Sequence, residues 1–235
     1  MRPFFILMGL AFVSSIETPA PTRTKDPIHL NAANPQVPVD VPVPELIQAS
    51  ENGDVDAVQE ILLKNVPIDE PNNVGWTALM KASFYGHEEV VRVLLNAGAN
   101  AGVYGGEQAD SSLTLASANG HVDIVKALLL SEGGRGTLNM KDAGGWTPLV
   151  WAAQQGHAKV VRLLLSAGAL IDGAPDGGSP LAGATAAGHL DVIRILLEAG
   201  ANPNKPDGKG TTPLSLAKNQ TVRAALSVEV EKNEL

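Results

Sequence analysis

Residues 144–172 read GGWTPLVWAAQQGHAKVVRLLLSAGALID. This stretch contains two apolar segments, Leu149–Ala153 and Val160–Leu165. In each segment apolar residues stand at i, i+3 and i+4, the spacing that places them on one face of a helix. Gly156 and Gly168 follow the two segments and are placed to end each helix with a positive φ. The stretch therefore predicts two short helices joined by a turn.

Copies of this unit recur along the chain. The pair Gly-His stands at 86–87, 120–121, 156–157 and 188–189, and the related pair Gly53-Asp54 precedes them. The successive glycines are 33, 34, 36 and 32 residues apart. Nine residues before each glycine of a full pair is a hydroxyl residue: Thr77, Ser111, Thr147 and Ser179. One unit cannot bury both of its faces, so the repetition predicts a stack of units.

A period close to 33 residues with this pattern resembles the ankyrin repeat, over residues 44 to 226. The resemblance implies an all-α ankyrin-repeat solenoid of stacked helix-turn-helix units with β-turn or hairpin connectors. The predicted organisation is a signal peptide (1–15), a Pro-rich linker (16–43), the ankyrin-repeat domain (44–228) and a polar tail (229–235). Within the domain we expect an N-terminal capping repeat (44–73), repeats at 74–106, 107–143, 144–176 and 177–208, and a C-terminal cap (209–228).

The third repeat departs from the pattern. Ser131–Gly136 replaces the short Gly-Ala closing segment, and we expect a protruding or mobile loop there. The start of this repeat, Glu107–Asp110, lacks the turn glycine. The family's usual histidine after Thr-Pro-Leu is absent throughout, so the hydrogen bonds of that histidine must be replaced or missing.

The N-terminal residues predict export. Arg2 precedes the apolar run Phe4–Val13, which is too short to cross a bilayer and fits a secretory signal peptide. An uncleaved anchor or a chance apolar start is the alternative. An exported chain without cysteine favours a bacterial periplasm, with secretion or the endoplasmic-reticulum lumen as alternatives, because Lys232–Leu235 resembles a retention tail.

The charge distribution bears on the partner. The net charge is 17 − 25 = −8, which argues against nucleic acid and gives no support for anionic membranes. From Asp40 to Asp110 there are twelve acids against three bases, a net of 3 − 12 = −9, whereas residues 111–235 hold eleven of each. This asymmetry favours a partner with a basic patch; an acidic surface that serves solubility alone is the alternative.

Residue types that could support catalysis are scarce. Four of the five histidines occupy the Gly-His position of separate repeats, whose helices stack about 8–10 Å apart, whereas zinc needs ligands at about 2 Å. Gly208–Thr212 resembles a phosphate loop only in composition. With no cysteine, nucleophile elbow or distinctive carboxylate pair, the sequence predicts no catalytic residue, cofactor or metal.

The aromatic residues give the candidate binding site. Beyond the signal peptide there are six, all in repeats 2 to 4: Trp76, Phe84, Tyr85, Tyr104, Trp146 and Trp151. They occupy turn and first-helix positions, where similar ankyrin proteins vary their residues and touch partners, and exposed Trp and Tyr dominate interface hot spots. We expect one concave aromatic patch with a polar rim of Asn73, Glu107, Asp110, Asn119, Gln154 and Gln155. The alternative is that some of the aromatics, Trp151 especially, pack between repeats.

These observations predict a non-catalytic protein-binding module that is monomeric until bound. Its export and small size favour an inhibitor or self-protection partner of an extracytoplasmic enzyme such as a cell-wall hydrolase. An exported scaffold or host-directed effector is the second hypothesis, and an enzyme is a third that no residue supports.

Overall fold

The structure, a computed structural model, describes residues 45–174, 177–206 and 210–233. The predicted signal peptide and the linker, including His29, lie outside these residues, as do Pro175, Asp176 and residues 207–209. The elements are α1 (Glu45–Asn52), α2 (Val55–Leu62), α3 (Ala78–Tyr85), α4 (Glu88–Asn96), β1 (Tyr104–Gly105), β2 (Asp110–Ser111), α5 (Ser112–Asn119), α6 (Val122–Leu130), α7 (Glu132–Gly136), α8 (Pro148–Gln154), α9 (Ala158–Ser166), α10 (Pro180–Ala187), α11 (Leu190–Glu198), α12 (Pro213–Leu216) and α13 (Gln220–Asn233).

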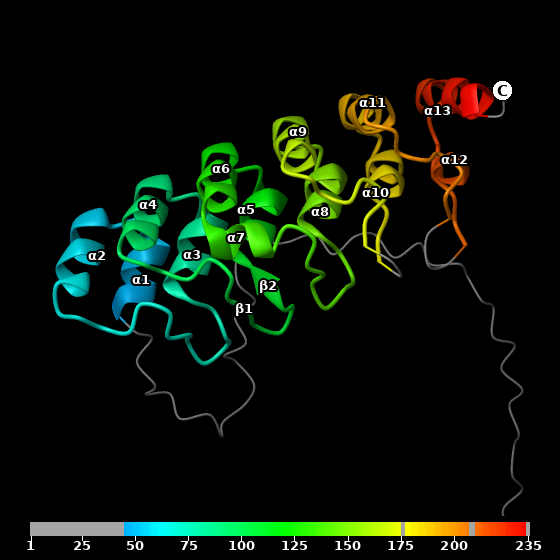
Figure 1. The fold of residues 1–235 in the computed structure, drawn as a ribbon. Helices are drawn as coiled ribbons and strands as arrows, with labels where there is room; N and C mark the ends of the chain where they lie inside the picture. The colour runs from blue at the N-terminus through cyan, green and yellow to red at the C-terminus, as the bar shows by residue number, and fades with distance from the viewer. Residues whose placement is uncertain (1–44, 175–176, 207–209, 234–235) are drawn as a thin grey trace, which may run out of the picture.

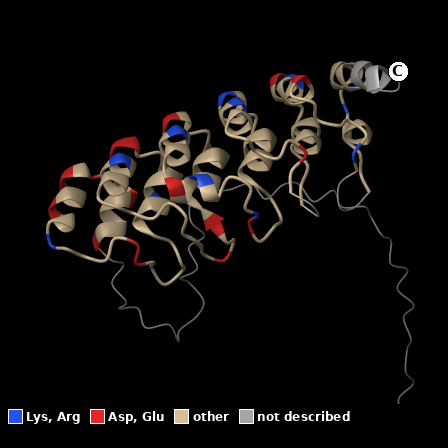
Figure 2. Ribbon diagram, in the orientation of Figure 1, with Lys and Arg blue, Asp and Glu red and all other residues tan. Residues whose placement is uncertain are grey.

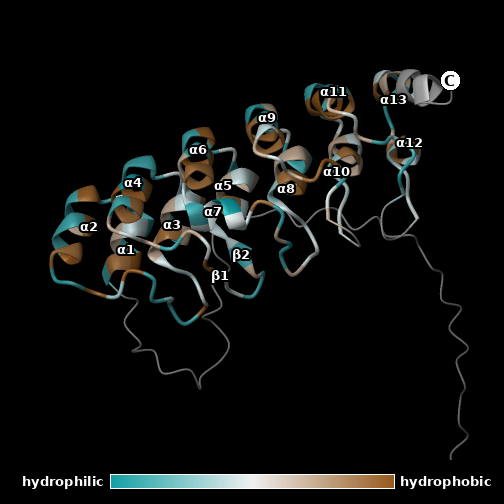
Figure 3. Ribbon diagram, in the orientation of Figure 1, coloured by the Kyte–Doolittle hydropathy of each residue, from teal (hydrophilic) through white to brown (hydrophobic). Residues whose placement is uncertain are grey.

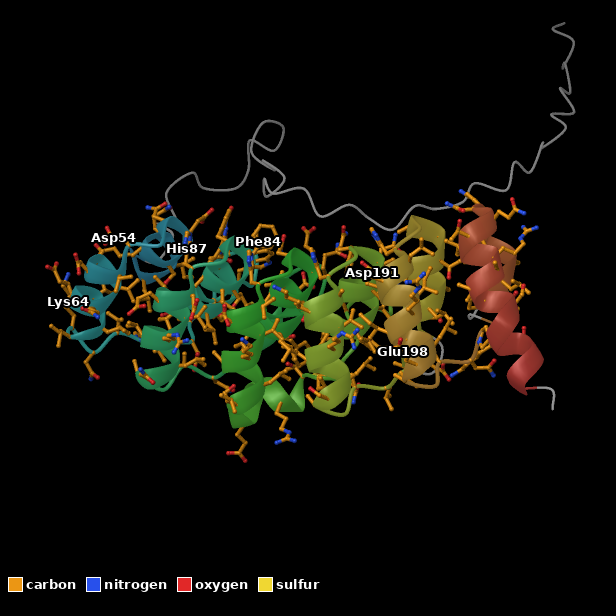
Figure 4. All side chains as sticks on the ribbon, turned by 90° about the horizontal axis from the view of Figure 1, so that it is seen from above. Asp54, Lys64, Phe84, His87, Asp191 and Glu198 are labelled. Carbon is orange, nitrogen blue, oxygen red and sulfur yellow. The ribbon has the colours of Figure 1, made fainter. Side chains whose placement is uncertain are left out.

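The helices form two rows. In Figure 1 the first helices of the repeats (α1, α3, α5, α8, α10, α12) make the lower row, and the second helices (α2, α4, α6, α9, α11, α13) lie above them. Figure 4 shows Asp54 and Lys64 at the two ends of α2, and Asp191 and Glu198 in the same order along α11. Equivalent helices therefore run in the same direction along the stack of repeats, which runs from left to right in Figure 1, as the predicted solenoid requires.

Five of the six first helices, all except α1, begin directly after a hydroxyl residue. The side-chain oxygen accepts a hydrogen bond from the backbone N–H three residues later, which satisfies a donor that the helix leaves free. The pairs are Thr77 with Met80 (3.3 Å), Ser111 with Thr114 (3.1 Å), Thr147 with Val150 (3.4 Å), Ser179 with Ala182 (3.3 Å) and Thr212 with Ser215 (3.3 Å). Pro148, Pro180 and Pro213 occupy the first turns of their helices, where the missing backbone N–H of proline is not needed for a helical hydrogen bond.

The Gly-His pairs join neighbouring repeats. Each histidine places Nε2 against a backbone carbonyl of the repeat before it: His87 on Glu51 (2.9 Å), His121 on Phe84 (3.1 Å), His157 on Ala118 (3.1 Å) and His189 on Gln154 (3.0 Å). Because a carbonyl oxygen only accepts, the Nε2 atom is the one that carries the proton. The predicted structural role of these histidines follows from this geometry.

Up to two features require a glycine in the Gly-His pairs. Gly120 has φ 75°, a left-handed conformation that side chains rarely adopt. A Cβ on Gly120 would also lie 2.6 Å from the imidazole of His157, which belongs to the next repeat. Gly188 has the same conformation, φ 81°, but no atom of a following repeat within 4 Å of the Cβ position. Backbone conformation and inter-repeat packing therefore both require glycine at position 120, whereas only the backbone conformation requires it at position 188.

His157 is expected to make the stack sensitive to acid. Burial lowers its pKa below the ordinary 6.5; the Ala118 carbonyl acts in the opposite direction, and positive charge on His121 or His189 lowers it further. When the pKa of a histidine is lower in the folded than in the unfolded state, the unfolded chain binds the proton more tightly. The contribution of neutral His157 to the free energy of unfolding is therefore complete above about pH 6.5 and is lost as the pH falls toward the folded-state pKa. An NMR titration of the imidazole should give a pKa below 6.5, and the free energy of unfolding should fall between pH 7 and 5.5 less steeply in His157→Gln. A measured pKa of 6.5 or above contradicts this.

The core lies between the two rows. Leu, Ile, Val and Ala fill it, including Leu79, Leu94, Leu113, Leu128 and Leu164, each no more than 1% exposed. Figure 3 shows the apolar segments of the helices turned toward the neighbouring row. Each repeat contributes to one continuous core, which explains why no single repeat needs a core of its own.

Three expectations about the ends and the third repeat need correction or detail. The predicted loop at 131–136 is wrong, because α7 occupies Glu132–Gly136, with Ser131 accepting from the Gly134 N–H (3.2 Å) as its N-cap. At the glycine-free start of this repeat, Ala109 takes the left-handed turn conformation, φ 50°. Helix α13 continues to Asn233, so the proposed tail at 229–235 begins inside a helix.

Candidate functional site

The six predicted aromatics lie in the turns and first helices, which together form what we call the inner face. Three of them, Trp76, Phe84 and Tyr85, gather on α3 and the turn before it. Trp146 and Trp151 form a second group on α8 and its preceding turn. Helix α5 lies between α3 and α8 (Figure 1), so the predicted single patch is divided into two groups.

The first group is built around a buried lysine. The Lys81 Nζ atom lies 5.1 Å from the centroid of the Trp76 ring and 5.7 Å from that of Tyr85. Phe84 packs edge-on against Trp76 at 5.4 Å and against Tyr85 at 5.1 Å between centroids. The Glu51 carboxylate from α1 completes the group: it is 3.0 Å from Lys81 Nζ and accepts a hydrogen bond of 2.9 Å from the Tyr85 hydroxyl. We call these five residues the Lys81 group.

Each residue of the Lys81 group is held by its repeat. The turn before α3 is closed by Asn72, whose Oδ1 accepts from the backbone N–H groups of Val74 and Trp76 (3.2 and 2.9 Å). Trp76 is thereby fixed immediately before the N-cap residue Thr77, and its indole packs on Gly106 at the end of the same repeat, where a Cβ would lie 2.7 Å from Nε1. The Lys81 group spans two repeats because Glu51 belongs to the repeat before the other four residues.

The second group has a carboxylate as its anchor. Asp142 Oδ1 accepts from the backbone N–H groups of Gly144 and Trp146, both at 2.9 Å, in the same turn geometry as Asn72. Its other oxygen, Oδ2, accepts a 2.6 Å hydrogen bond from the indole N–H of Trp151. The rings of Trp146 and Trp151 lie 4.7 Å apart between centroids, and Trp146 packs over Gly178 of the next repeat.

The structure corrects the exposure expected for three predicted contact residues. Trp151 is 3% exposed and packs in the interior, the alternative that the sequence left open for it. Phe84 is buried within the Lys81 group, and Asp110 is buried at the base of the β1–β2 hairpin, paired in register with Gly105. These three side chains therefore support the face from within and do not line its surface. Trp151 is held inward by its hydrogen bond to Asp142, and Phe84 is covered by the rings of Trp76 and Tyr85.

The other predicted aromatics reach the surface to different degrees. Tyr104 in β1 is 55% exposed, whereas Trp76, Tyr85 and Trp146 are half-buried. These four residues are the aromatic surface that the inner face offers to a partner.

The predicted polar rim is partly engaged within the chain. Asn73 in the turn and Glu107 in the hairpin loop are exposed. Asn119 is half-buried and donates through Nδ2 to the Leu115 carbonyl at 2.9 Å. Gln154 and Gln155 are half-buried at the end of α8.

Sequence reasoning missed Lys81, Glu51 and Asp142 as organising residues. A usable signal existed for Lys81, because the Gly-His spacing aligns it with the apolar Leu115 and Trp151 of the next two repeats. A cation at an apolar position of a repeat indicates a specific partner for its charge. Asp142 aligns with Asn72, and both stand four residues before a tryptophan.

The charge of the described residues follows the asymmetry of the sequence. Residues 45–110 hold eleven acids against Lys64, Lys81 and Arg92, a net of 3 − 11 = −8. Each of these bases lies near an acid: Glu45 (4.0 Å), Glu51 (3.0 Å) and Glu88 (2.7 Å), respectively. Figure 2 shows the acidic positions concentrated over the α1 to α4 end of the stack. The Lys81 group therefore sits in a negative field.

In the part of the chain that the structure describes, no three His, Asp or Glu side chains are grouped to hold a metal ion. None of the described helices combines the length and the apolar character needed to cross a membrane.

Comparisons with known proteins agree with the repeat geometry. The family model for ankyrin repeats (three copies) matches residues 46–139 and 113–207. A solved ankyrin-repeat domain from Acinetobacter baumannii AYE aligns with a TM-score of 0.68 and 30% identity, over 79% of this chain and 97% of that chain.

Curated relatives match only in part. "Ankyrin repeat, SAM and basic leucine zipper domain-containing protein 1" is 35% identical over 48% of this chain in Carollia perspicillata and 33% identical over 58% in Microcebus murinus. The chain spans 24% and 29% of the lengths of these relatives, about a quarter of each. Ankyrin repeats are typically protein-binding modules without catalytic activity. The matched residues cover well over half of the sequence, and the chain belongs to the ankyrin-repeat family.

Proposed function

We propose that the inner face binds another protein, with Trp76, Tyr85, Tyr104 and Trp146 as its main contacts. The observation that carries this proposal is the 55% exposure of Tyr104 beside three half-buried aromatics on one row of helices and turns. Half-buried Trp and Tyr are already ordered by neighbours, so a partner gains apolar area at little cost in side-chain entropy. Asn73 and Glu107 would lie at the edge of the contact.

The finer proposal is an exported binder that inhibits an extracytoplasmic enzyme, with a periplasmic location. Its support is the apolar run Phe4–Val13 and the net charge of −8 over residues 45–110, which favours a partner with a basic surface around its active site. No cofactor or metal enters this proposal. The chain acts by covering its partner, so the complex would be stoichiometric.

Loss of Trp76 or Tyr85 is the direct test of the inner face. The full chain should capture one partner from the extracytoplasmic fraction of its source, and Trp76→Ala or Tyr85→Ala should weaken the purified complex by roughly 2 kcal/mol, about thirtyfold in Kd. Because Trp76 and Tyr85 also pack within the chain, Tyr104→Ala is the variant that leaves the fold least disturbed. Calorimetric titration gives the affinities.

Leu130→Ala is the matched control, since Leu130 is exposed at the end of α6, in the row of second helices and away from the inner face. Equal affinities for wild type and all three aromatic variants would reject the inner face as the binding site. An unchanged rate for the captured enzyme at saturating chain would reject inhibition and leave binding in place. Recovery of the chain outside the cell would favour the scaffold or effector hypothesis.

A further inference from the structure

Glu51 is the one carboxylate of the Lys81 group and is both fixed and accessible. Its Oε1 accepts from the Tyr85 hydroxyl at 2.9 Å and its Oε2 lies 3.0 Å from Lys81 Nζ. The Glu51 side chain is 24% exposed, whereas that of Lys81 is 8% exposed. An approaching molecule therefore meets the carboxylate, and the ammonium group lies behind it.

The position of Lys81 indicates that its charge orients the Glu51 carboxylate. In the next two repeats the same position holds Leu115 and Trp151, which are buried side chains that carry no charge of their own. Burying an ammonium group is unfavourable unless it is paired, and a buried ion pair is often no more stabilising than apolar residues of similar size. Packing alone does not call for a lysine here. The lysine, with Tyr85, holds the Glu51 carboxylate in one orientation on the inner face.

We propose that Glu51, flanked by Trp76 and Tyr85, is the subsite for an arginine side chain of the protein partner; this rests on the proposed function of the inner face. A carboxylate oxygen has two lone pairs, so each oxygen of Glu51 retains one beyond its internal contact. The planar guanidinium fork matches a carboxylate and is more weakly hydrated than an ammonium group, which favours arginine over lysine. The methylene stem of the arginine packs against the half-buried rings of Trp76 and Tyr85.

The surrounding charge supports a cation at this point. Residues 45–110 carry a net charge of −8, and each of their three bases already lies near an acid. An incoming arginine therefore enters a negative field in which Glu51 is the carboxylate backed by aromatic rings.

The test uses the full chain and three peptides that differ in one residue type: acetyl-GARARAG-amide, and the same peptide with lysine or glutamine in place of arginine. Binding is followed by NMR through the Trp76 indole N–H and the backbone amides of Glu51 and Tyr85. The arginine peptide should bind several-fold more tightly than the lysine peptide, and the glutamine peptide should not shift these signals. Glu51→Gln should weaken the arginine peptide roughly tenfold, the effect of one charge-assisted contact.

Two further variants separate the subsite from the general negative field. Glu45→Gln removes an equal charge from the same helix at a side chain that is 79% exposed, and should change the affinity less than twofold. The double variant Glu51→Gln/Lys81→Leu keeps the net charge of the wild type and leaves no unpaired lysine, so it should fold. Because it lacks the Glu51 carboxylate, its affinity for the arginine peptide should still be lost. Equal effects of Glu51→Gln and Glu45→Gln, or unchanged binding by the double variant, would overturn the subsite.

The same variants distinguish this inference from the proposed function. A partner that is released by Tyr104→Ala but held normally by the double variant uses the inner face without the arginine subsite, and overturns only the subsite. If peptide binding requires Glu51 but none of the three aromatic variants changes the affinity for the partner, the proposed inner-face complex is rejected and Glu51 remains an arginine-binding position outside that complex.

Discussion

Replacing Trp151 by alanine is expected to destabilise the domain by about 3–5 kcal/mol, the range for removal of a buried large aromatic. The side chain is 3% exposed, and its indole N–H donates to Asp142 Oδ2 at 2.6 Å, so the substitution leaves a cavity and removes a charge-assisted hydrogen bond. Urea unfolding followed by circular dichroism measures the loss.

Trp146 provides the comparison, because it is half-buried and lies 4.7 Å from Trp151 between ring centroids. Trp146→Ala should cost less than half as much stability while weakening partner binding. Trp151→Phe keeps most of the volume and should lose about 1–3 kcal/mol through the missing indole donor. Equal destabilisation by Trp151→Ala and Trp146→Ala would show that the two rings have the same structural role, contrary to their burial.

Gly120→Ala is expected to destabilise the stack by about 2–4 kcal/mol. The positive φ of 75° costs an alanine about 1–2 kcal/mol. The new methyl group would also lie 2.6 Å from the His157 ring, which must move and lose its hydrogen bond to Ala118, about 0.5–1.5 kcal/mol in addition to the repacking.

Gly188→Ala isolates the conformational part of this cost. Gly188 has φ 81° and open space at the Cβ position, so only the backbone penalty of about 1–2 kcal/mol applies. The difference between the two variants measures the contact between repeats. NMR should show a displaced His157 imidazole in Gly120→Ala and unchanged histidine signals in Gly188→Ala. Equal free energies of unfolding for the two variants would contradict a role for the histidine contact.

The likeness to known proteins extends to the repeat architecture. The solved Acinetobacter domain is covered over 97% of its length, whereas the curated mammalian relatives are covered over about a quarter of theirs. The shared part is therefore the stack of repeats, and the fold by itself does not name a partner. Export, inhibition and a basic partner stay predictions, and the capture and peptide experiments test them separately.

The sequence by itself determined the stack, because the signals that specify it are local. A hydroxyl cap such as Thr147, a proline such as Pro148 in the first turn and a glycine such as Gly156 with a positive φ act within a few residues. Their recurrence at 32 to 36 residues then required stacking, since one pair of helices cannot cover both of its faces. The structural role of the Gly-His histidines followed from the same spacing.

Tertiary structure decided which aromatic residues face solvent and what charges accompany them. Trp151 and Trp146 differ in burial because Asp142 draws one indole inward through a hydrogen bond while the other lies over Gly178 of the next repeat. Glu51 and Lys81 are thirty residues apart and meet only when α1 packs beside α3. The spacing of the repeats in the sequence determines which positions become neighbours in the stack. The contacts that form there depend on the shape and charge of the side chains at those positions, which only the packed repeats reveal.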